Sequence, residues 1–449
     1  MTIRYPLPNI LPGTPIGERP FAGIKNVVRV FSENGHYFAV DERDRVICQD
    51  SPTACIQEAI NSIEYGTVFL GPGKFVVSQT ITLNQFVALV GSGYNITLIR
   101  EDPTRTANAP LISSSNSWFI VLKDLMVEGN RYDINPSDQN GVGLISLTAS
   151  STSPPSSPVD YYGRDSYVLL ENVVVRNSRG HGIYISGIVE PRLINVVALN
   201  NMGHGFYLDA GDMKVVGCTS GNNGGSGFLI LGNGLIIASK AYGSGLGGPS
   251  PNSPSPSLTG ADDDFFITGF GHVILAGTEA GENYRYCYTI YKTYNVLVYG
   301  RCYDAGLQND YTNGGVTSYG LNVDGSKGVI AHLDYDDTIR AANNLPIKGI
   351  PVLIQDSASV GVDKVFVNVV AYRRAQDYAV WVSPTYALVR VNEKVVYGNG
   401  GAWSYIQTLS SCSNLPSSGL YPGQTYVCYN SSSSTWQIAI WTGSQWIYK

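Results

Sequence analysis

A short motif of the form Gly-x-Gly, followed by alternating apolar residues, recurs in the middle of the chain. Its clearest copies begin at Gly180, Gly203 and Gly225, so successive copies are 23 and 22 residues apart. Each copy holds two short β-branched runs separated by Asn, Gly or Ser residues, and none holds a helical pattern of useful length. A unit of about 22 residues cannot bury its apolar side alone, whereas units stacked about 4.8 Å apart can. The repeat therefore predicts a parallel β-solenoid.

Alternation along a strand assigns the side chains of each copy to the inside or the outside of the coil. The residues three and five positions after the first glycine are apolar and are expected to stack in the core: Ile183, Ile185, Phe206, Leu208, Phe228 and Ile230. The residues one, four and six positions after that glycine are expected to point outward. Across neighbouring coils they place His181 over His204, Tyr184 over Tyr207, and Ser186 over Asp209.

These outward positions form an exposed patch of imidazole, phenol and carboxylate groups. A sugar ring has apolar C–H faces and a rim of hydroxyls, so aromatic rings beside hydrogen-bonding groups suit it. We therefore take five residues as candidate glycan-binding residues: His181, Tyr184, His204, Tyr207 and Asp209. The alternative is that these aromatic residues only stabilise the solenoid by stacking from coil to coil, and the pattern itself leaves both interpretations open.

One amphipathic helix is predicted over residues 54–63, with its apolar residues on one face. It lies just before the strands that start at Thr67. An open solenoid end exposes unpaired backbone, and a short helix across it blocks edge-to-edge association. We expect the helix to cap the solenoid, although an ordinary packed helix would make the same contacts.

The segment 45–100 resembles the start of a pectate-lyase-like right-handed parallel β-helix. The resemblance is carried by Ile56-Gln-Glu-Ala-Ile, then Gly66-Thr-Val-Phe-Leu-Gly-Pro-Gly-Lys-Phe, then Val87-Ala-Leu-Val-Gly-Ser-Gly. The later repeats extend it to about residue 395. This superfamily includes polysaccharide lyases, polygalacturonases and viral tailspikes. The resemblance implies an all-β chain with a β-helix over residues 46–400, and it does not choose among these functions.

Catalytic residues are not assigned. Polygalacturonase-like enzymes carry paired aspartates ahead of a Gly-His-Gly motif, whereas the acidic run 262–264 follows both copies of Gly-His-Gly. Glycoside hydrolysis needs two carboxylates about 5–9 Å apart. The pairs Asp209 with Asp212, and Asp334 with Asp336, are candidates that no motif supports. The acidic cluster that holds calcium in pectate lyases is not visible in the repeats, so we predict no metal and no cofactor.

The remaining segments differ in composition from the coils. Residues 1–45 begin with a Pro-rich stretch that has no apolar run of signal-peptide length, and are expected to form an N-terminal arm, either docked onto a virion or loose. Ser/Pro-rich insertions at 148–158 and 247–257 either wall the patch into a groove or are passive loops. Residues 401–449 hold four of the six Trp and are similar to small C-terminal β-modules of phage tail proteins. Their aromatic residues bind glycan, hold subunits together, or form a small core, and the sequence leaves these alternatives open.

The seven cysteines fall into short-range sets. The sets are Cys48 with Cys55, Cys287 with Cys302, and Cys412 with Cys428, and Cys218 is left over. None has the Cys-x-x-Cys spacing of a zinc site. Three local disulfides fit an oxidising environment, and buried free thiols are the alternative.

Charge and hydropathy exclude two classes of function. Only 14% of residues are charged and the net charge is −6, so a nucleic-acid-binding surface has no support. No run of 18 apolar residues is present, so no membrane span is expected. The low charge with abundant Tyr, Ser and Gly favours an extracellular protein, and is similar to structural proteins of viruses of thermoacidophilic archaea.

The leading hypothesis is a viral tailspike or tail-fibre protein that attaches the virion to host cell-surface glycans. Its arm would contact other tail proteins, and the resemblance implies a homotrimer located on the virion outside the cell. One alternative is a polysaccharide-degrading enzyme, a glycoside hydrolase or lyase, on a virion or secreted. Another is a cell-surface adhesin or structural protein.

Overall fold

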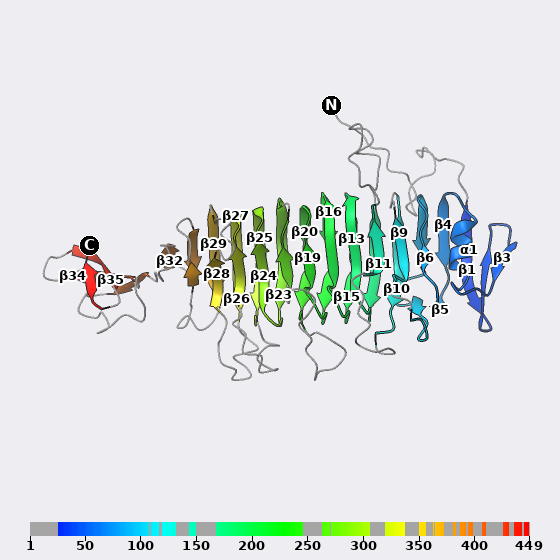
Figure 1. Cartoon of the computed structure of the whole chain (residues 1–449), viewed down its shortest axis with the longest axis horizontal. Helices are drawn as coiled ribbons and strands as arrows, with labels where there is room; N and C mark the ends of the chain where they lie inside the picture. Colours follow the sequence, from blue (N-terminus) through cyan, green and yellow to red (C-terminus); the bar gives the residue numbers. More distant parts are fainter. Residues whose placement is uncertain are drawn as a thin grey trace, which may run out of the picture. The chain divides into compact units, whose positions relative to one another are not determined.

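The structure of the chain is a computed structural model. The residues it describes are 26–106, 109–115, 119–131, 143–149, 168–245, 263–269, 271–305, 319–336, 350–355, 362, 364–371, 380–382, 387–391, 394–397, 406–409, 425–430, 435–441 and 444–448. They belong to two compact units. Unit 1 comprises residues 1–228 and 246–260, and unit 2 comprises residues 229–245 and 261–449. The described residues are nearly all β, with one short helix, and the coils are those of a right-handed parallel β-helix (Figure 1).

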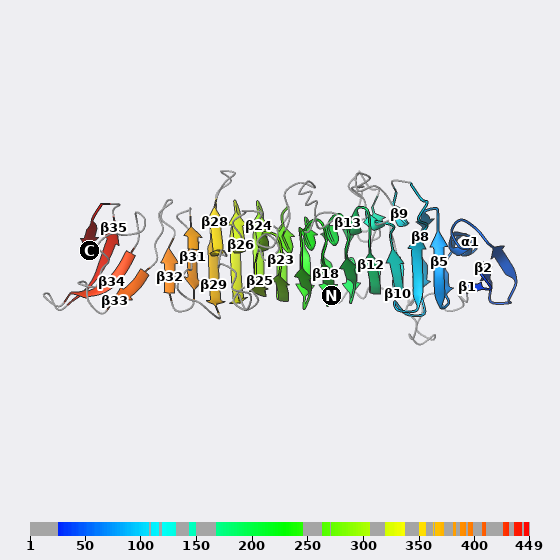
Figure 2. The same cartoon turned by 90° about the horizontal axis from the view of Figure 1, so that it is seen from below.

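Unit 1 consists of coils whose strands pair in parallel with those of the next coil. The strands of its larger sheet are β4 (Gly66–Leu70), β5 (Gly73–Val77), β7 (Val87–Val90), β8 (Thr97–Glu101), β10 (Val121–Glu128), β12 (Leu169–Arg176), β14 (Arg192–Ile194), β15 (Val197–Leu199), β17 (Met213–Val216) and β18 (Thr219–Gly221). The strands of its smaller sheet are β6 (Ile81–Thr82), β9 (Ile112–Ser115), β11 (Gly143–Thr148), β13 (His181–Val189) and β16 (Phe206–Gly211). Figure 2 shows these strands as successive rungs of the unit.

The predicted core stacks of unit 1 are confirmed. β13 and β16 pair in register, with Ile183 opposite Phe206 and Ile185 opposite Leu208, and all four side chains are fully buried. The ring of Phe206 stacks on that of Phe228 with centroids 4.5 Å apart and planes within 2°. The alternation therefore places one apolar side chain of each coil directly over that of the coil before it.

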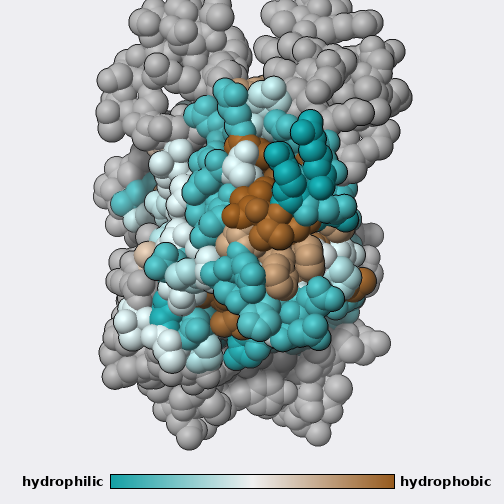
Figure 3. Space-filling view, turned by 90° about the vertical axis from the view of Figure 1, so that its right-hand side faces the viewer, coloured by the Kyte–Doolittle hydropathy of each residue, from teal (hydrophilic) through white to brown (hydrophobic). Residues whose placement is uncertain are grey.

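Three antiparallel strands and the helix lie at the N-terminal end of unit 1. β1 (Val27–Glu33) pairs in parallel with β4 and antiparallel with β2 (His36–Val40), which pairs with β3 (Val46–Gln49). Residues 26–45, predicted as part of an arm, thus contain the strands β1 and β2, and residues 1–25 lie outside the described residues. Figure 3 looks onto this end and shows apolar side chains surrounded by polar ones.

The predicted helix is shorter than expected. α1 (Ile56–Asn61) covers six of the ten residues proposed and buries Ile56, Ala59 and Ile60. Cys55 precedes it with a left-handed backbone, φ 64°. A capping role for α1 stays a prediction, because the pairing of β1 with β2 already occupies the edge of the parallel sheet.

Unit 2 repeats the two-sheet plan. Its larger sheet has β20 (Gly234–Ile237), β21 (Lys240–Tyr242), β23 (Val273–Gly281), β25 (Tyr294–Tyr303), β27 (Lys327–Asp336), β29 (Val365–Ala371), β31 (Ala387–Val391) and β32 (Lys394–Tyr397). Its smaller sheet has β22 (Phe265–Ile267), β24 (Tyr286–Tyr291), β26 (Tyr319–Asp324), β28 (Ile350–Gln355) and β30 (Val380–Val382), and β19 (Phe228–Ile230) spans the division between the units. Each strand in the series β23, β25, β27, β29 and β31 pairs in parallel with the next. The last of them, β31, also pairs with β32 in the antiparallel direction.

A separate four-stranded sheet is formed near the C-terminus by β33 (Ile406–Leu409), β34 (Thr425–Asn430), β35 (Thr435–Trp441) and β36 (Trp446–Tyr448). β34, β35 and β36 are successive antiparallel strands, and β33 joins β34 in parallel. The domain boundaries predicted at residues 45 and 400, and the role of this sheet, stay predictions.

Two of the suggested cysteine sets are disulfides. Cys48 is bonded to Cys55 and Cys287 to Cys302. Cys218 is free and buried, and burial raises the pKa of its thiol to about 12. Cys412 lies outside the described residues. The insertion 247–257 and residues 150–158 of the insertion 148–158 also lie outside them. Within the described part of the chain, no helix has the length and apolar character needed to cross a bilayer.

Candidate functional site

Tyr184 and Tyr207 form a ladder on the outer side of unit 1. They occupy paired positions on β13 and β16, and their rings stack with centroids 4.5 Å apart and planes 21° from parallel. Both side chains are half-buried. On β11, the residue paired with Tyr184 is the small Ser146. The predicted alignment of the two tyrosines is therefore confirmed, and their accessible surface is aromatic.

The carboxylate of Asp209 lies next to this tyrosine ladder, two residues after Tyr207 on β16. The hydroxyl of Ser186 donates a hydrogen bond to Asp209 Oδ2 at 3.0 Å. The carboxylate is half-buried and has further lone pairs with which to accept hydrogen bonds. Burial, followed by the neighbouring charges of Tyr184 and Asp209, raises the pKa of Tyr207. The phenol is therefore a neutral donor at physiological pH, and the carboxylate an acceptor.

His181 and His204 stack as predicted, but the expectation that they are exposed is wrong. Their ring centroids are 4.8 Å apart, and their side chains are only 6% and 4% exposed. Each ring instead bonds the backbone of the following coil. His204 N donates to His181 Nδ1 at 3.0 Å, and Ser226 N donates to His204 Nδ1 at 2.9 Å. The two imidazoles are thus hydrogen-bond acceptors for buried N–H groups, and not part of an exposed patch.

This geometry sets the protonation of the two histidines. A ring nitrogen that accepts an N–H bond must carry no proton, so each ring is neutral with its proton on Nε2. Burial lowers the pKa of His181 to about 4. Burial, helped by the charge of His181, lowers the pKa of His204 to about 3. Neither group can serve as an acid at neutral pH.

The glycines of the repeat make room for these rings. A Cβ on Gly203 would lie 2.6 Å from His181 Nδ1, and one on Gly225 would lie 2.7 Å from His204 Nδ1. The Gly-His-Gly motif is accordingly a device for packing one turn on the next. His181 also stacks against Tyr184, with centroids 6.1 Å apart, so it supports the tyrosine ladder from behind.

The described part of the acidic run 262–264 is internal. Asp263 and Asp264 are fully buried, and Asp262 lies outside the described residues. Asp263 pairs with Arg285, while Asp264 accepts hydrogen bonds from Ser244 and Asn283. Burial raises the pKa of both carboxyls, that of Asp264 to about 7. These carboxyls are structural and cannot reach a polysaccharide. Among the described residues, no group of three or more His, Cys, Asp or Glu side chains is placed to hold a metal.

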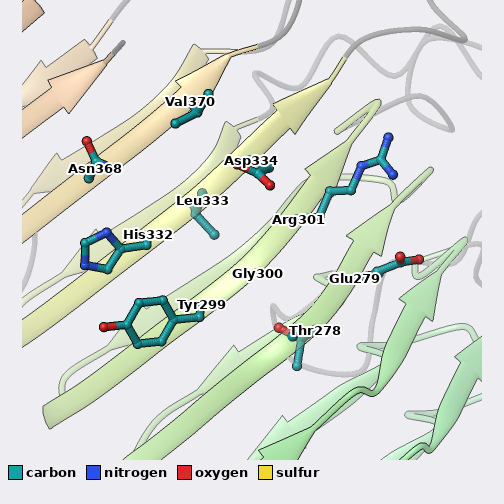
Figure 4. Close-up of a pocket in the computed structure, with 11 residues that line it drawn as sticks. Thr278, Glu279, Tyr299, Gly300, Arg301, His332, Leu333, Asp334, Asn368 and Val370 are labelled. Atoms are coloured by element: carbon teal, nitrogen blue, oxygen red, sulfur yellow. The ribbon is translucent and has the colours of Figure 1, made fainter. Parts of the chain in front are cut away.

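A shallow depression of about 400 Å³ on unit 2 was not predicted. It lies on the outer side of β23, β25, β27 and β29, and Figure 4 shows its side chains in two rows. One row holds Tyr299, His332 and Asn368, and the other holds Glu279, Arg301 and Asp334. These coils lack the Gly-x-Gly motif, so their outward positions could not be assigned by counting from its first glycine. The available signal was the alternation along β27, which points His332 and Asp334 outward.

Comparison with known proteins places the fold. No protein-family model matches the chain, and no curated protein sequence matches it. Among solved structures it is similar to full-length tailspike protein 2 from Escherichia coli O157:H7 bacteriophage CAB120, at 14% identity and TM-score 0.55, over 81% of this chain and 46% of that one. It is also similar to the enzymatically active domain of bacteriophage CBA120 tailspike protein 2, at 14% identity and TM-score 0.53, over 77% of this chain and 50% of that one.

A third similar structure is ORF18 of Geobacillus virus E2, at 13% identity and TM-score 0.50, over 87% of this chain and 83% of that one. The chain spans about half the length of the two tailspike structures. At these identities the similarity is one of fold. The chain therefore has a right-handed parallel β-helix, a fold that it shares with these phage tailspike structures.

Proposed function

We propose that the protein is a virion-associated tailspike or tail-fibre protein whose β-helix attaches the particle to glycans on the host cell surface. The observation that carries the proposal is the tyrosine ladder, with the Asp209 carboxylate beside it on the outside of unit 1. The fold shared with phage tailspikes supports the same assignment.

The chemistry of the ladder suits a saccharide. Aromatic rings pack against the apolar C–H faces of a sugar, and a carboxylate accepts hydrogen bonds from its hydroxyls. The ladder offers only two stacked rings and one carboxylate, so we expect each copy to bind weakly. A homotrimer would present three copies, and simultaneous engagement raises avidity through effective concentration. We infer such a homotrimer, with residues 1–45 contacting other tail proteins. The composition alone supports an archaeal virus as the source.

A binding experiment tests the proposal. The full chain is applied to an array of immobilised bacterial and archaeal cell-surface polysaccharides, beside a Tyr184→Ala/Tyr207→Ala double variant. The matched control is Tyr94→Ala, because Tyr94 is 43% exposed in unit 1 and lies outside the ladder. We expect the wild type and Tyr94→Ala to bind the same polysaccharide and the double variant to lose it. Binding that survives in the double variant contradicts the ladder as the site.

The viral assignment needs its own measurement. Immunogold labelling with an antibody to the chain should mark one end of virus particles. Uniform labelling of a cell surface would favour the adhesin, and release of new reducing ends from a bound polysaccharide would favour the enzyme.

A further inference from the structure

We propose that the depression on unit 2 is a second saccharide site, and that it selects a neutral sugar presenting two adjacent hydroxyls. The inference rests on the proposed function for the class of ligand, but it concerns a different surface and a different set of residues.

Two aromatic rings form a platform in the depression. Tyr299 of β25 and His332 of β27 are paired in register, and their rings are parallel within 2° with centroids 4.8 Å apart. Tyr299 is 46% exposed. Figure 4 shows both rings on the outer side of their strands, whereas the side chain of Leu333 lies behind the strand. The platform is therefore available to the apolar face of a sugar.

Small residues leave the space next to this platform. On β23, Ala276 is paired with Tyr299, and Gly277 follows as an extra residue that shifts the register. Gly277 has a φ of +63°, and a Cβ placed on it would meet nothing within 4 Å. The residue of β23 paired with Tyr299 is therefore too small to cover its ring, and the bulge at Gly277 leaves open space beside it.

A buried tyrosine side chain, that of Tyr288, supports the floor of the depression from the core. Gly300 follows Tyr299 on β25, and a Cβ on it would lie 2.4 Å from the hydroxyl of Tyr288. That phenol is fully buried and bonds Thr278 Oγ1 at 3.1 Å. The Tyr288 side chain thus fixes β23 and β25 together beneath the platform, so the site is preorganised.

Two polar side chains without a hydrogen-bond partner among the described residues also line the depression. The carboxylate of Asp334 and the amide of Asn368 make no hydrogen bond or ion pair among the residues that the structure describes, and Asp334 is exposed. A carboxylate accepts hydrogen bonds from two hydroxyls, and an amide both donates and accepts. Together with the platform, this combination matches a sugar ring with adjacent hydroxyls.

The charges decide between neutral and acidic sugars. Arg301 is paired with Asp336 at 3.1 Å, and Glu279 is paired with Lys240 at 3.5 Å. Both pairs are internally neutralised, whereas the charge of Asp334 is not. Among the residues that the structure describes, the depression is left with one negative charge outside these two pairs, which disfavours a uronic acid relative to a neutral hexose.

A titration of the full chain with simple glycosides tests the inference. The probes are methyl α-mannopyranoside, methyl β-galactopyranoside and methyl β-glucuronide, followed by saturation-transfer NMR. We expect at least one neutral glycoside to bind and the glucuronide to bind more weakly. Asp334→Asn and Tyr299→Ala should each weaken the neutral glycoside by about tenfold. Ile274→Ala is the matched control, because Ile274 is 41% exposed on the same sheet and does not line the depression.

Failure of the inference can be told apart from failure of the proposed function. Absence of binding by every glycoside, equal binding of the glucuronide, or binding unchanged in both depression variants would overturn the inference. If polysaccharide binding on the array is lost only in the Tyr184→Ala/Tyr207→Ala variant, the proposed function stands without a second site. If glycoside binding depends on Asp334 while array binding ignores the tyrosine ladder, the second site stands and the ladder does not.

Discussion

The backbone N–H of His204 donates a hydrogen bond to the imidazole Nδ1 of His181, and the two rings stack 4.8 Å apart. The next coil repeats the bond between Ser226 N and His204 Nδ1. Each histidine therefore satisfies a buried N–H of the following turn, where strand pairing has not yet begun. This relationship explains why His stands between two glycines, and it carries the first two predictions.

His204→Ala should destabilise unit 1. The substitution removes the acceptor for the buried N–H of Ser226 and leaves a gap in the ring stack. Loss of an acceptor for a buried donor costs about 1–3 kcal/mol. Urea unfolding followed by circular dichroism measures the loss. His272→Ala is the control, because His272 is exposed. Equal stability of the two variants would show that the hydrogen bond does not contribute.

His181 and His204 should stay neutral far below the usual range of a histidine. Their pKa values, about 4 and about 3, lie below the ordinary 6.5 because both rings are buried. The unfolded chain binds protons first as the pH falls, so this contribution to stability is present above pH 6.5 and is lost progressively toward pH 4 and below. NMR titration of ring Cε1–H signals, assigned with His181→Asn and His204→Asn, checks it. Titration of either ring near pH 6.5 in the folded protein would contradict the assignment.

Asp264 should make the stability depend on pH in the direction opposite to that of His181 and His204. Burial raises the pKa of its carboxyl from 3.8 to about 7, so the folded state holds this proton more tightly than the unfolded state does. The contribution is present below pH 3.8 and is lost as the pH rises through 7. The free energy of unfolding of the wild type should therefore fall relative to that of Asp264→Asn between pH 4 and 7. Urea unfolding of both at pH 4, 5.5 and 7 tests this. A constant difference would mean that the carboxyl titrates normally.

The disulfide between Cys287 and Cys302 should stabilise unit 2. It closes a loop with a sequence separation of 15 residues. A loop of that length is worth about 3 kcal/mol in the chain-entropy account. We expect a Cys287→Ala/Cys302→Ala variant to unfold at lower urea concentration, and non-reducing peptide mapping to find the two cysteines linked. Cys218→Ala provides a control in which no cross-link is removed. Recovery of both residues as free thiols from the oxidised protein would refute the pairing.

The sequence alone determined the coil and much of its outer face. The spacing of Gly180, Gly203 and Gly225 predicted the solenoid, and period-two alternation predicted both the buried stack at Phe206 and the pairing of Tyr184 with Tyr207. These features are predictable because they depend on local patterns, which are the direction of successive side chains on a strand and the length of chain in one turn.

The tertiary structure alone decided which outward positions reach solvent and where a depression forms. His181 occupies an outward position by count, yet its ring folds back onto the N–H of the next coil, a partner that only the turn conformation reveals. Tyr299, His332 and Asp334 come together through strand register and a one-residue bulge at Gly277, across connections of unequal length. The repeat spacing in the sequence does not reveal this register. Each inserted residue changes the number of residues between equivalent positions, whereas the hydrogen bonds between paired strands still bring their side chains into line.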